Sequence, residues 1–166
     1  VDALLRQATP GLDLAPLPPT SVPEPGSRMA QLAQALDLGS DALDLVTLAL
    51  ATELDNKYEA LFAYLNNDVT RKWPTPELAL RLWARDAAHR LRLRQCLAPE
   101  APLMALGVLD VVPATREAAR NQRGLRLNAA LADWLQGLDW QDEKLSGMVR
   151  CAVAARARSP GPPPGA

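Results

Sequence analysis

The sequence lacks the residues that the common catalytic and cofactor-binding motifs require. It contains a single histidine, His89, which excludes a metal site built on a pair of histidines. None of its three lysines, Lys57, Lys72 and Lys144, follows a glycine or precedes a serine or threonine, so the phosphate-binding loop of the P-loop ATPases is absent. We therefore predict that this chain is not an enzyme, that it holds no cofactor or metal, and that His89 is structural.

Cysteine and long apolar runs are also scarce. Cys96 and Cys151 form no C-x-x-C pair, so the sequence indicates neither a zinc site nor a disulfide framework. We expect two reduced, buried or half-buried thiols, because free cysteine behaves as a small apolar residue. No apolar run reaches the roughly 18 residues of a membrane span, and no signal peptide opens the chain. These absences predict a cytoplasmic protein without a membrane partner.

Only seven residues are aromatic, four of them tryptophan, and the net charge is −1. A core built mostly from Leu, Ala and Val favours helices, because Ala and Leu lose little side-chain freedom in a helix. The near-neutral charge gives no overall attraction to nucleic acid. At 166 residues the chain has the length of one domain, which we expect to be mainly α-helical.

Proline divides the chain into three parts. Ten of the fifteen prolines lie between Pro10 and Pro25 or between Pro160 and Pro164, and such segments favour extended linkers over helices. We therefore predict a proline-rich linker over residues 1–27, a folded domain over 28–158 and a flexible tail over 159–166. Because the chain begins at Val1 and not at Met, we expect it to be part of a longer polypeptide.

Two stripes of apolar residues predict the first helices. Ser40 is an expected N-cap, and Asp41 would complement the positive end of the helix dipole. Apolar residues then recur at spacings of three and four, which indicates a buried helix face. The first stripe contains Leu43, Val46, Leu50 and Leu54, and the second contains Tyr58, Leu61, Phe62 and Leu65.

Two further helices are expected after a proline-rich break at residues 73–77. Thr75 would be the N-cap and Pro76 the first helical residue, where the missing N–H of proline costs nothing. The buried side of that helix would contain Leu78, Leu82 and Trp83. The next helix, from about Asp86 to Leu97, carries Leu91, Leu93 and Cys96.

A short hairpin follows. Residues 107–113 hold the one concentrated β-branched run, and residues 124–127 alternate in a way that could pair with it. Asn128 can then cap a helix from Ala129 to Leu135, which Gly137 would end. Helices followed by a hairpin and a helix predict a mainly α domain with a winged-helix-like element, although residues 108–112 could instead form a buried helical turn. A last helix is expected over residues 142–157.

Charge is distributed unevenly within the folded part. Residues 28–68 contain two basic and seven acidic residues, whereas residues 71–94 contain seven basic and two acidic residues. The basic stretch could bind DNA phosphates, pair with the acidic half, or contact a partner protein, and the near-neutral total favours protein. The candidate interaction surface consists of Asp68, Arg71, Lys72, Arg81, Arg85, Arg90, Arg92 and Arg94.

The segment Leu48–Leu80 reads LALATELDNKYEALFAYLNNDVTRKWPTPELAL. It resembles a signature of the N-terminal region of a family of bacterial AAA+ ATPases, and the similarity extends more loosely over residues 29–137. This chain departs from the family pattern at Thr52, Lys57 and Asn67. The resemblance implies a helical and winged-helix region ahead of a P-loop motor, so ATP and magnesium would belong to a motor domain that this chain lacks.

Within this segment most residues predict architecture. Glu53 and Asp55 could cap a helix junction, Tyr58 and Tyr64 offer rings for packing, and Asp68 is close to Arg71 for a local ion pair. A peptide- or nucleotide-sensing role for Asp68 and Arg71 is the alternative. The leading hypothesis is an accessory domain that recruits proteins to an AAA+ motor or regulates it; a DNA-binding winged-helix regulator is second.

Overall fold

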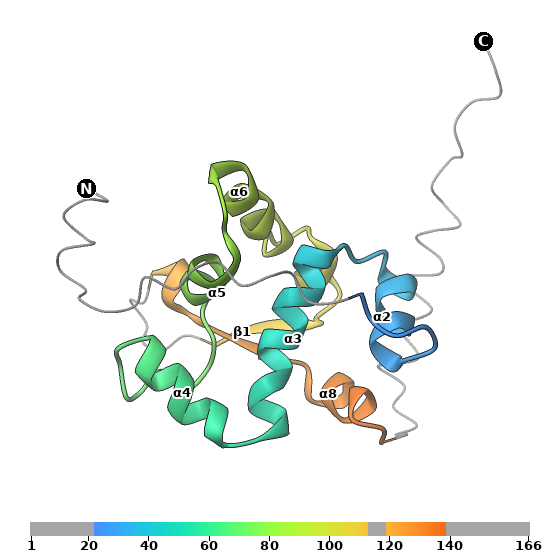
Figure 1. The fold of residues 1–166 in the computed structure, drawn as a ribbon, viewed down its shortest axis with the longest axis horizontal. Helices are drawn as coiled ribbons and strands as arrows, with labels where there is room; N and C mark the ends of the chain where they lie inside the picture. The colour runs from blue at the N-terminus through green and yellow to red at the C-terminus, as the bar shows by residue number, and fades with distance from the viewer. Residues whose placement is uncertain (1–21, 113–118, 139–166) are drawn as a thin grey trace, which may run out of the picture.

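The computed structural model describes residues 22–112 and 119–138 of the chain (Figure 1). Within these ranges the fold is mainly helical with one two-stranded antiparallel hairpin, as predicted. The elements in order are α2 (Arg28–Leu36), α3 (Ser40–Leu54), α4 (Lys57–Leu65), α5 (Pro76–Trp83), α6 (Ala87–Cys96), α7 (Pro102–Ala105), β1 (Leu109–Val112), a 3-10 turn η1 (Arg120–Gln122), β2 (Gly124–Leu127) and α8 (Ala129–Leu135).

The hairpin predicted from the β-branched run forms. Leu109 pairs with Leu127 and Val111 with Leu125, while Asp110 lies opposite Arg126. Alternate residues of a strand point to opposite faces, so the leucines reach the core and the charged pair remains on the outer face. The alternation of residues 124–127 was therefore a strand signal, and the helical-turn alternative for residues 108–112 is wrong.

A third segment borders the hairpin. The backbone N–H of Leu125 donates a 2.7 Å hydrogen bond to the carbonyl of Pro74, so β2 is bonded to β1 on one side and to the approach to α5 on the other. Gly124 makes this proximity possible, because a Cβ there would lie 3.1 Å from the Trp73 Cβ. The turn between α4 and α5 is thereby fixed against the loop end of the hairpin, where Val112 pairs with Gly124.

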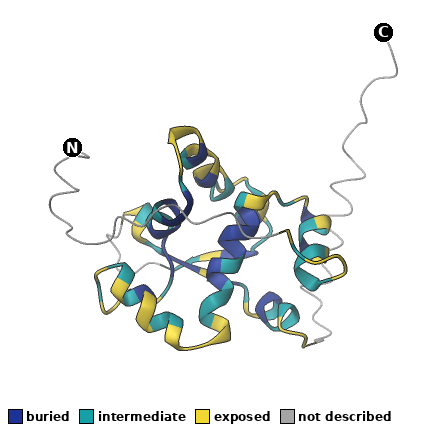
Figure 2. Cartoon of the chain, viewed as in Figure 1, coloured by how far each residue is buried: buried dark blue, intermediate teal, exposed yellow. Residues whose placement is uncertain are grey.

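Helix α3 is the centre of the domain and contacts β2, α4 and α6 (Figure 1). Its middle is fully enclosed, with Leu45, Val46 and Ala49 at 0% exposure, and Figure 2 shows buried residues along most of its length. The core around it contains leucines from α2, α5, α6, α7, α8 and both strands, together with Phe62 of α4 and Trp83 of α5. This is the aromatic-poor, leucine-rich core expected from the composition.

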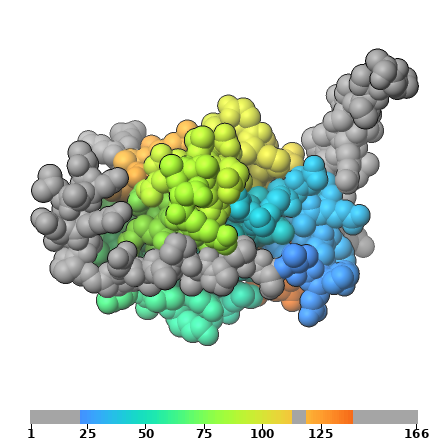
Figure 3. Space-filling model, turned by 45° about the horizontal axis from the view of Figure 1, so that its top comes forward, coloured from blue at the N-terminus to red at the C-terminus, as the bar shows by residue number. Residues whose placement is uncertain are grey.

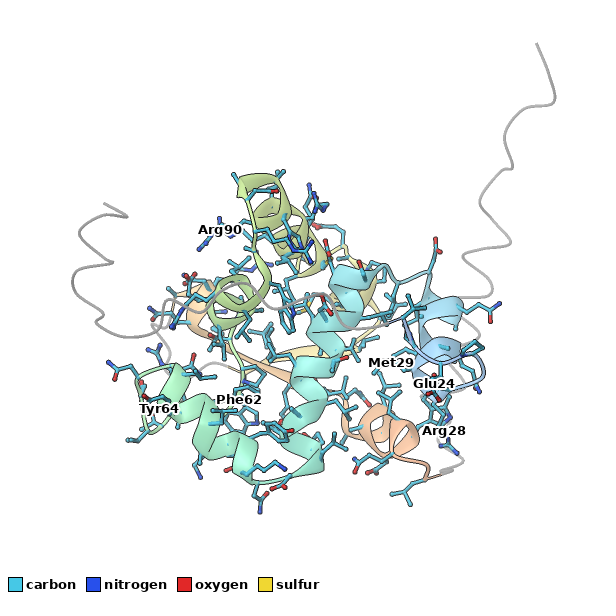
Figure 4. The ribbon with its side chains drawn as sticks, viewed as in Figure 1. Glu24, Arg28, Met29, Phe62, Tyr64 and Arg90 are labelled. Carbon is cyan, nitrogen blue, oxygen red and sulfur yellow. The ribbon has the colours of Figure 1, made fainter. Side chains whose placement is uncertain are left out.

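Helix α2 packs against α8, the last described helix. The Arg28 guanidinium donates from Nη1 to the carbonyls of Trp134 (2.6 Å) and Leu138 (3.2 Å), and it lies 5.6 Å from the centroid of the Trp134 ring. Cations stabilise the negative end of a helix and its unpaired carbonyls. Arg28 therefore fastens α2 to the end of α8, where Figure 4 labels it.

The helix ends follow the predicted caps in two cases and differ in one. The Thr75 hydroxyl accepts from the Leu78 N–H at 3.1 Å, and Asn128 Oδ1 accepts from the Leu131 N–H at 3.3 Å. The prediction that Ser40 is an N-cap is wrong, because α3 begins at Ser40 and its cap residue is Gly39, which supplies no side-chain bond. A serine one residue inside a helix has the sequence signature of a cap but not the extended backbone.

Several apolar positions assigned to buried faces are exposed. Leu54 is 57% exposed, Leu61 45% and Leu91 57%, whereas Leu43, Phe62 and Leu93 from the same stripes are buried. Periodicity identifies the face but not where a helix extends past its neighbours. The predicted helix over residues 142–157, the linker before residue 22 and the tail over 159–166 lie outside the described residues.

Candidate functional site

Helices α5 and α6 form a helix-turn-helix pair joined by residues 84–86, and α6 precedes the hairpin in the chain. Asp86 caps α6 by accepting the His89 N–H at 2.7 Å, and this bond holds the pKa of the Asp86 carboxyl below its ordinary value. Figure 3 shows α5 and α6 on the visible face beside α3. The outer side of α6 carries exposed Leu91, Arg94 and Gln95.

The predicted basic stripe is largely engaged within the chain. Arg92 Nε lies 3.4 Å from Asp41, Lys72 Nζ 3.2 Å from Glu59, and Arg90 Nη2 3.2 Å from Glu77. Arg81 donates to the carbonyl of Leu65 at 3.1 Å. Basic residues of the 71–94 stretch therefore pair in part with acidic residues of the 28–68 stretch. This pairing within the domain was one of the three alternatives for the basic stretch.

The residues of the predicted surface come from three parts of the chain: the turn after α4, helix α5 and helix α6 with the turn before it. Arg85, just before α6, and Arg94, in α6, are exposed. Neither makes an ion pair or a side-chain hydrogen bond among the described residues. Arg71 and Lys72 instead belong to the turn after α4.

His89 and Cys96 face the start of α3. The His89 Nε2 lies 3.2 Å from Asp41 Oδ1, with only 9% of its side chain exposed, in agreement with a structural role. Cys96 is half-buried, as expected. Burial and the negative charge of Asp41 raise the pKa of the Cys96 thiol.

The turn after α4 holds a compact polar cluster. Asp68 Oδ1 accepts from the Thr70 hydroxyl (2.6 Å) and the Thr70 N–H (2.9 Å), and its Oδ2 lies 2.9 Å from Arg71 Nε. The hydroxyl and then the backbone bond hold the pKa of the Asp68 carboxyl below its ordinary value. The predicted Asp68–Arg71 ion pair is confirmed. The two groups are close, but their geometry is not that of a hydrogen bond. Arg71 Nε is buried and makes no hydrogen bond among the described residues.

Beside this cluster lies a pocket of about 130 Å³. It opens between the turn after α4 and the loop end of the hairpin, where Val112 pairs with Gly124, and these two parts of the chain are about fifty residues apart in sequence. Arg71 reaches across it, donating from Nη2 to Gln122 Oε1 at 3.4 Å. The pocket is lined by Thr70, Arg71, Trp73, Thr75, Val112, Gln122 and Gly124.

Helix α4 presents an apolar face that the sequence reading missed. Tyr64 is 70% exposed and Val69, in the following turn, is 84% exposed. Figure 4 labels Tyr64 together with Phe62, which is buried on the other side of the same helix. The expectation that Tyr64 packs its ring is wrong, whereas the Tyr58 ring does pack, 6.4 Å from that of Phe62.

Two smaller expectations concern the junction between α3 and α4. Asp55 Oδ1 accepts the Lys57 N–H at 2.8 Å, so Asp55 caps this junction as predicted. Glu53 is exposed and makes no such bond in the described part of the chain.

Metal and membrane sites were sought in the same ranges. Among residues 22–112 and 119–138, no group of three His, Cys, Asp or Glu side chains is placed to hold a metal ion. Likewise, no helix in these ranges is long and apolar enough to cross a bilayer.

The order of helices, helix-turn-helix pair and hairpin defines the winged-helix class. The chain belongs to the winged helix domain family of the variant type, whose model matches residues 24–149, more than half of the chain. Searches of curated proteins and of solved structures found no match. The family match names no ATPase, so the resemblance to AAA+ proteins remains a prediction.

Proposed function

We propose that this winged-helix domain is a non-catalytic module that binds a protein partner and so recruits substrates to an AAA+ motor or regulates that motor. The observation that carries the protein-binding role is the apolar face of α4, where Leu61 and Tyr64 are exposed, together with exposed Val69 in the turn that follows. Neighbouring exposed apolar side chains that form a patch mark contact sites, and tyrosine is enriched where proteins meet. The link to an AAA+ motor is supported by the resemblance of residues 48–80, the segment that contains this face.

The charge arrangement supports the same proposal. Phosphate binding needs several cations that are free to contact the nucleic acid backbone. Here Arg90 and Arg92 are paired with carboxylates of the same domain, and Arg81 is bonded to a backbone carbonyl. Exposed pairs are individually weak, about 0–1 kcal/mol, yet each must be broken or shared before the arginine contacts a phosphate.

The first experiment reads the parent gene. We expect the open reading frame to continue past Ala166 into a G-x-x-x-x-G-K-[S/T] motif, with magnesium-dependent ATP turnover by the full-length protein and none by this domain. A frame without that motif would remove the motor from the proposal and leave the protein-binding role standing.

The second experiment separates α4 from α6. In the full-length protein, Tyr64→Ser removes the exposed ring from α4, and Leu91→Ser removes an exposed apolar side chain from α6. Both positions are exposed, so neither change should unfold the domain. We expect Tyr64→Ser to change ATP turnover or its response to added substrate several-fold, while Leu91→Ser does not. Equal responses of the two variants would count against an α4 contact.

DNA binding is the second candidate, and a specific observation favours it. Helix α6 contains no acidic residue and exposes Arg94 and Gln95 after a helix-turn-helix. Arginine and glutamine are the side chains that read guanine and adenine edges in the major groove. At about 50 mM salt, where phosphate contacts are strongest, a duplex shift that Arg94→Ala weakens would favour this candidate; no shift would exclude it.

A further inference from the structure

We propose that the pocket between the turn after α4 and the loop end of the hairpin binds a carboxylate of the protein partner. The carboxylate is either an acidic side chain or a chain terminus. This inference rests on the protein-binding role proposed above and gives that role its chemistry. It depends on how the pocket holds Arg71, on its walls and size, and on its position beside the α4 face.

Arg71 is held in place with part of its guanidinium unused. Its Nε side faces Asp68 Oδ2 at 2.9 Å, and Nη2 reaches Gln122 at 3.4 Å. Its Nη1 has no hydrogen-bond partner among the described residues. Guanidinium carries five N–H groups in a fixed fork that matches a carboxylate. Because Asp68 fixes one edge, the remaining donors are oriented before any ligand arrives.

The other polar atoms at the pocket leave few acceptors to compete. The Thr75 hydroxyl already donates to Asn66 Oδ1 at 3.1 Å and accepts from the Leu78 N–H. Among the residues that the structure describes, no Asp or Glu lines the pocket. The side-chain oxygen of Gln122 already accepts from Arg71, so the amide group of Gln122 offers its two N–H donors. A ligand that brings oxygen acceptors therefore meets donors.

The walls and the size indicate how the carboxylate is attached. Trp73, Val112 and Gly124 form an apolar side, which suits the methylenes of a side chain or the last residue of a peptide. The volume of about 130 Å³ is close to that of an engineered cavity, about 150 Å³, that holds one benzene ring. The space is sufficient for one side chain or for the end of a peptide.

Charge favours a carboxylate over a phosphate. Asp68 already offsets the single positive charge of Arg71, and Lys72 is directed to Glu59. A monoanion therefore fits better than a group carrying nearly two negative charges. Thr70 and Arg71 line the pocket directly after exposed Val69, so a partner lying on α4 can place an acidic group here.

The test uses the 166-residue chain and three hexapeptides. One has the sequence Gly-Ser-Ala-Glu-Ala-Gly with both ends capped, the second replaces Glu by Gln, and the third keeps Gln but ends in a free carboxylate. Two NMR signals report on the pocket: the Trp73 indole N–H and the Arg71 Nε–H. We expect millimolar binding of one acid peptide, shifting both signals, and at least tenfold weaker binding of the neutral peptide. Which acid peptide binds identifies a side chain or a terminus.

Variants confirm the place of binding. Arg71→Gln should weaken the acid peptide at least tenfold and Gln122→Ala about threefold, the latter without touching the Asp68 pair. Lys72→Gln is the matched control, since it removes one positive charge next to Arg71 but outside the pocket lining, and should change affinity less than twofold. Unchanged circular dichroism shows that each variant is folded.

Four results would overturn the inference: no shift with either acid peptide, equal binding of the neutral peptide, equal weakening by Lys72→Gln, or stronger Arg71-dependent binding of duplex DNA. The proposed function is tested separately. If the peptides fail while Tyr64→Ser still alters the full-length protein, the pocket assignment is wrong and the protein-binding role remains. If the acid peptide binds and Tyr64→Ser has no effect, the pocket is right and the α4 contact is wrong.

Discussion

The Thr75 hydroxyl donates a 3.1 Å hydrogen bond to Asn66 Oδ1 and accepts the Leu78 N–H with the same oxygen. The Asn66 amide group donates in turn to the carbonyls of Arg71 (3.3 Å) and Trp73 (3.2 Å). Two side chains thus close the turn between α4 and α5. Because the pocket lies on this turn, its shape depends on them.

Replacing Thr75 should destabilise the domain. Thr75 is buried, with 2% of its surface exposed. Thr75→Val keeps the shape of the side chain but removes both hydrogen bonds of the hydroxyl. We expect the free energy of unfolding to fall by about 1–3 kcal/mol, from the lost cap and an unsatisfied Asn66 oxygen. Urea unfolding measures it. Ser40→Ala is the control: Ser40 makes no cap bond, so its change should stay within about 0.5 kcal/mol.

Asn66 and Thr75 should be energetically coupled. A double-mutant cycle of Asn66→Ala and Thr75→Val is expected to give a coupling energy of about 0.5–3 kcal/mol, since residues in one hydrogen-bond network are not additive. The same urea unfolding curves supply all four corners of the cycle. Additive losses would mean that the 3.1 Å bond contributes nothing to stability.

A larger residue at Gly124 should separate the hairpin from the preceding turn. A Cβ at this position would already lie 3.1 Å from the Trp73 Cβ, and the branched side chain of Gly124→Val needs still more room. Overpacking of this kind costs about 1–3 kcal/mol. Thermal unfolding measures the loss, and amide exchange at Leu125 should show a weakened bond to Pro74. Unchanged exchange would show that Trp73 moves aside freely.

The Asp68 cluster should come apart in acid. Hydrogen bonds from the Thr70 hydroxyl and then its N–H hold the pKa of the Asp68 carboxyl below its ordinary 3.8. Its stabilising contribution is therefore complete above pH 3.8 and is lost as the pH falls through the lowered pKa. Carbon NMR of the carboxyl should show Thr70→Val moving this pKa upward and Thr70→Ser leaving it low. A titration unaffected by Thr70→Val would contradict the assigned cause.

Cys96 should be an unreactive thiol near neutral pH. Burial and then the charge of Asp41 raise the pKa of Cys96 above its ordinary 9.0, and only the thiolate reacts quickly. In a Cys151→Ser variant, where Cys96 is the single thiol, the iodoacetamide rate should rise with a midpoint above pH 9. Asp41→Asn should lower that midpoint. A midpoint below 9 would show that the thiol is accessible and not shielded by α3.

Local features of this protein could be read from the sequence because they depend on neighbouring residues. Thr75 and Pro76 start α5, Asn128 starts α8, and Asp68 pairs with Arg71 across three residues. Each involves atoms within one helical turn. The hairpin was predictable for the same reason, since alternation within each strand and a short separation predict the pairing.

The exposed and paired residues could not be predicted in this way. Whether Tyr64 packs or faces solvent depends on which neighbours α4 meets, and whether Arg92 is free depends on Asp41, fifty-one residues away. The pocket joins residues 70–75 to residues 112–124, and the backbone bond between Leu125 and Pro74 is one of the contacts that bring these distant parts of the chain together.

The sequence by itself determined a leucine-rich helical domain, its main helix starts, its hairpin and the lack of a P-loop, because composition, periodicity and local hydrogen bonds dictate these. The tertiary structure decided which charges neutralise one another, which face of α4 remains open, and where Arg71 points. Those are properties of surfaces brought together from distant parts of the chain, and only packing fixes them.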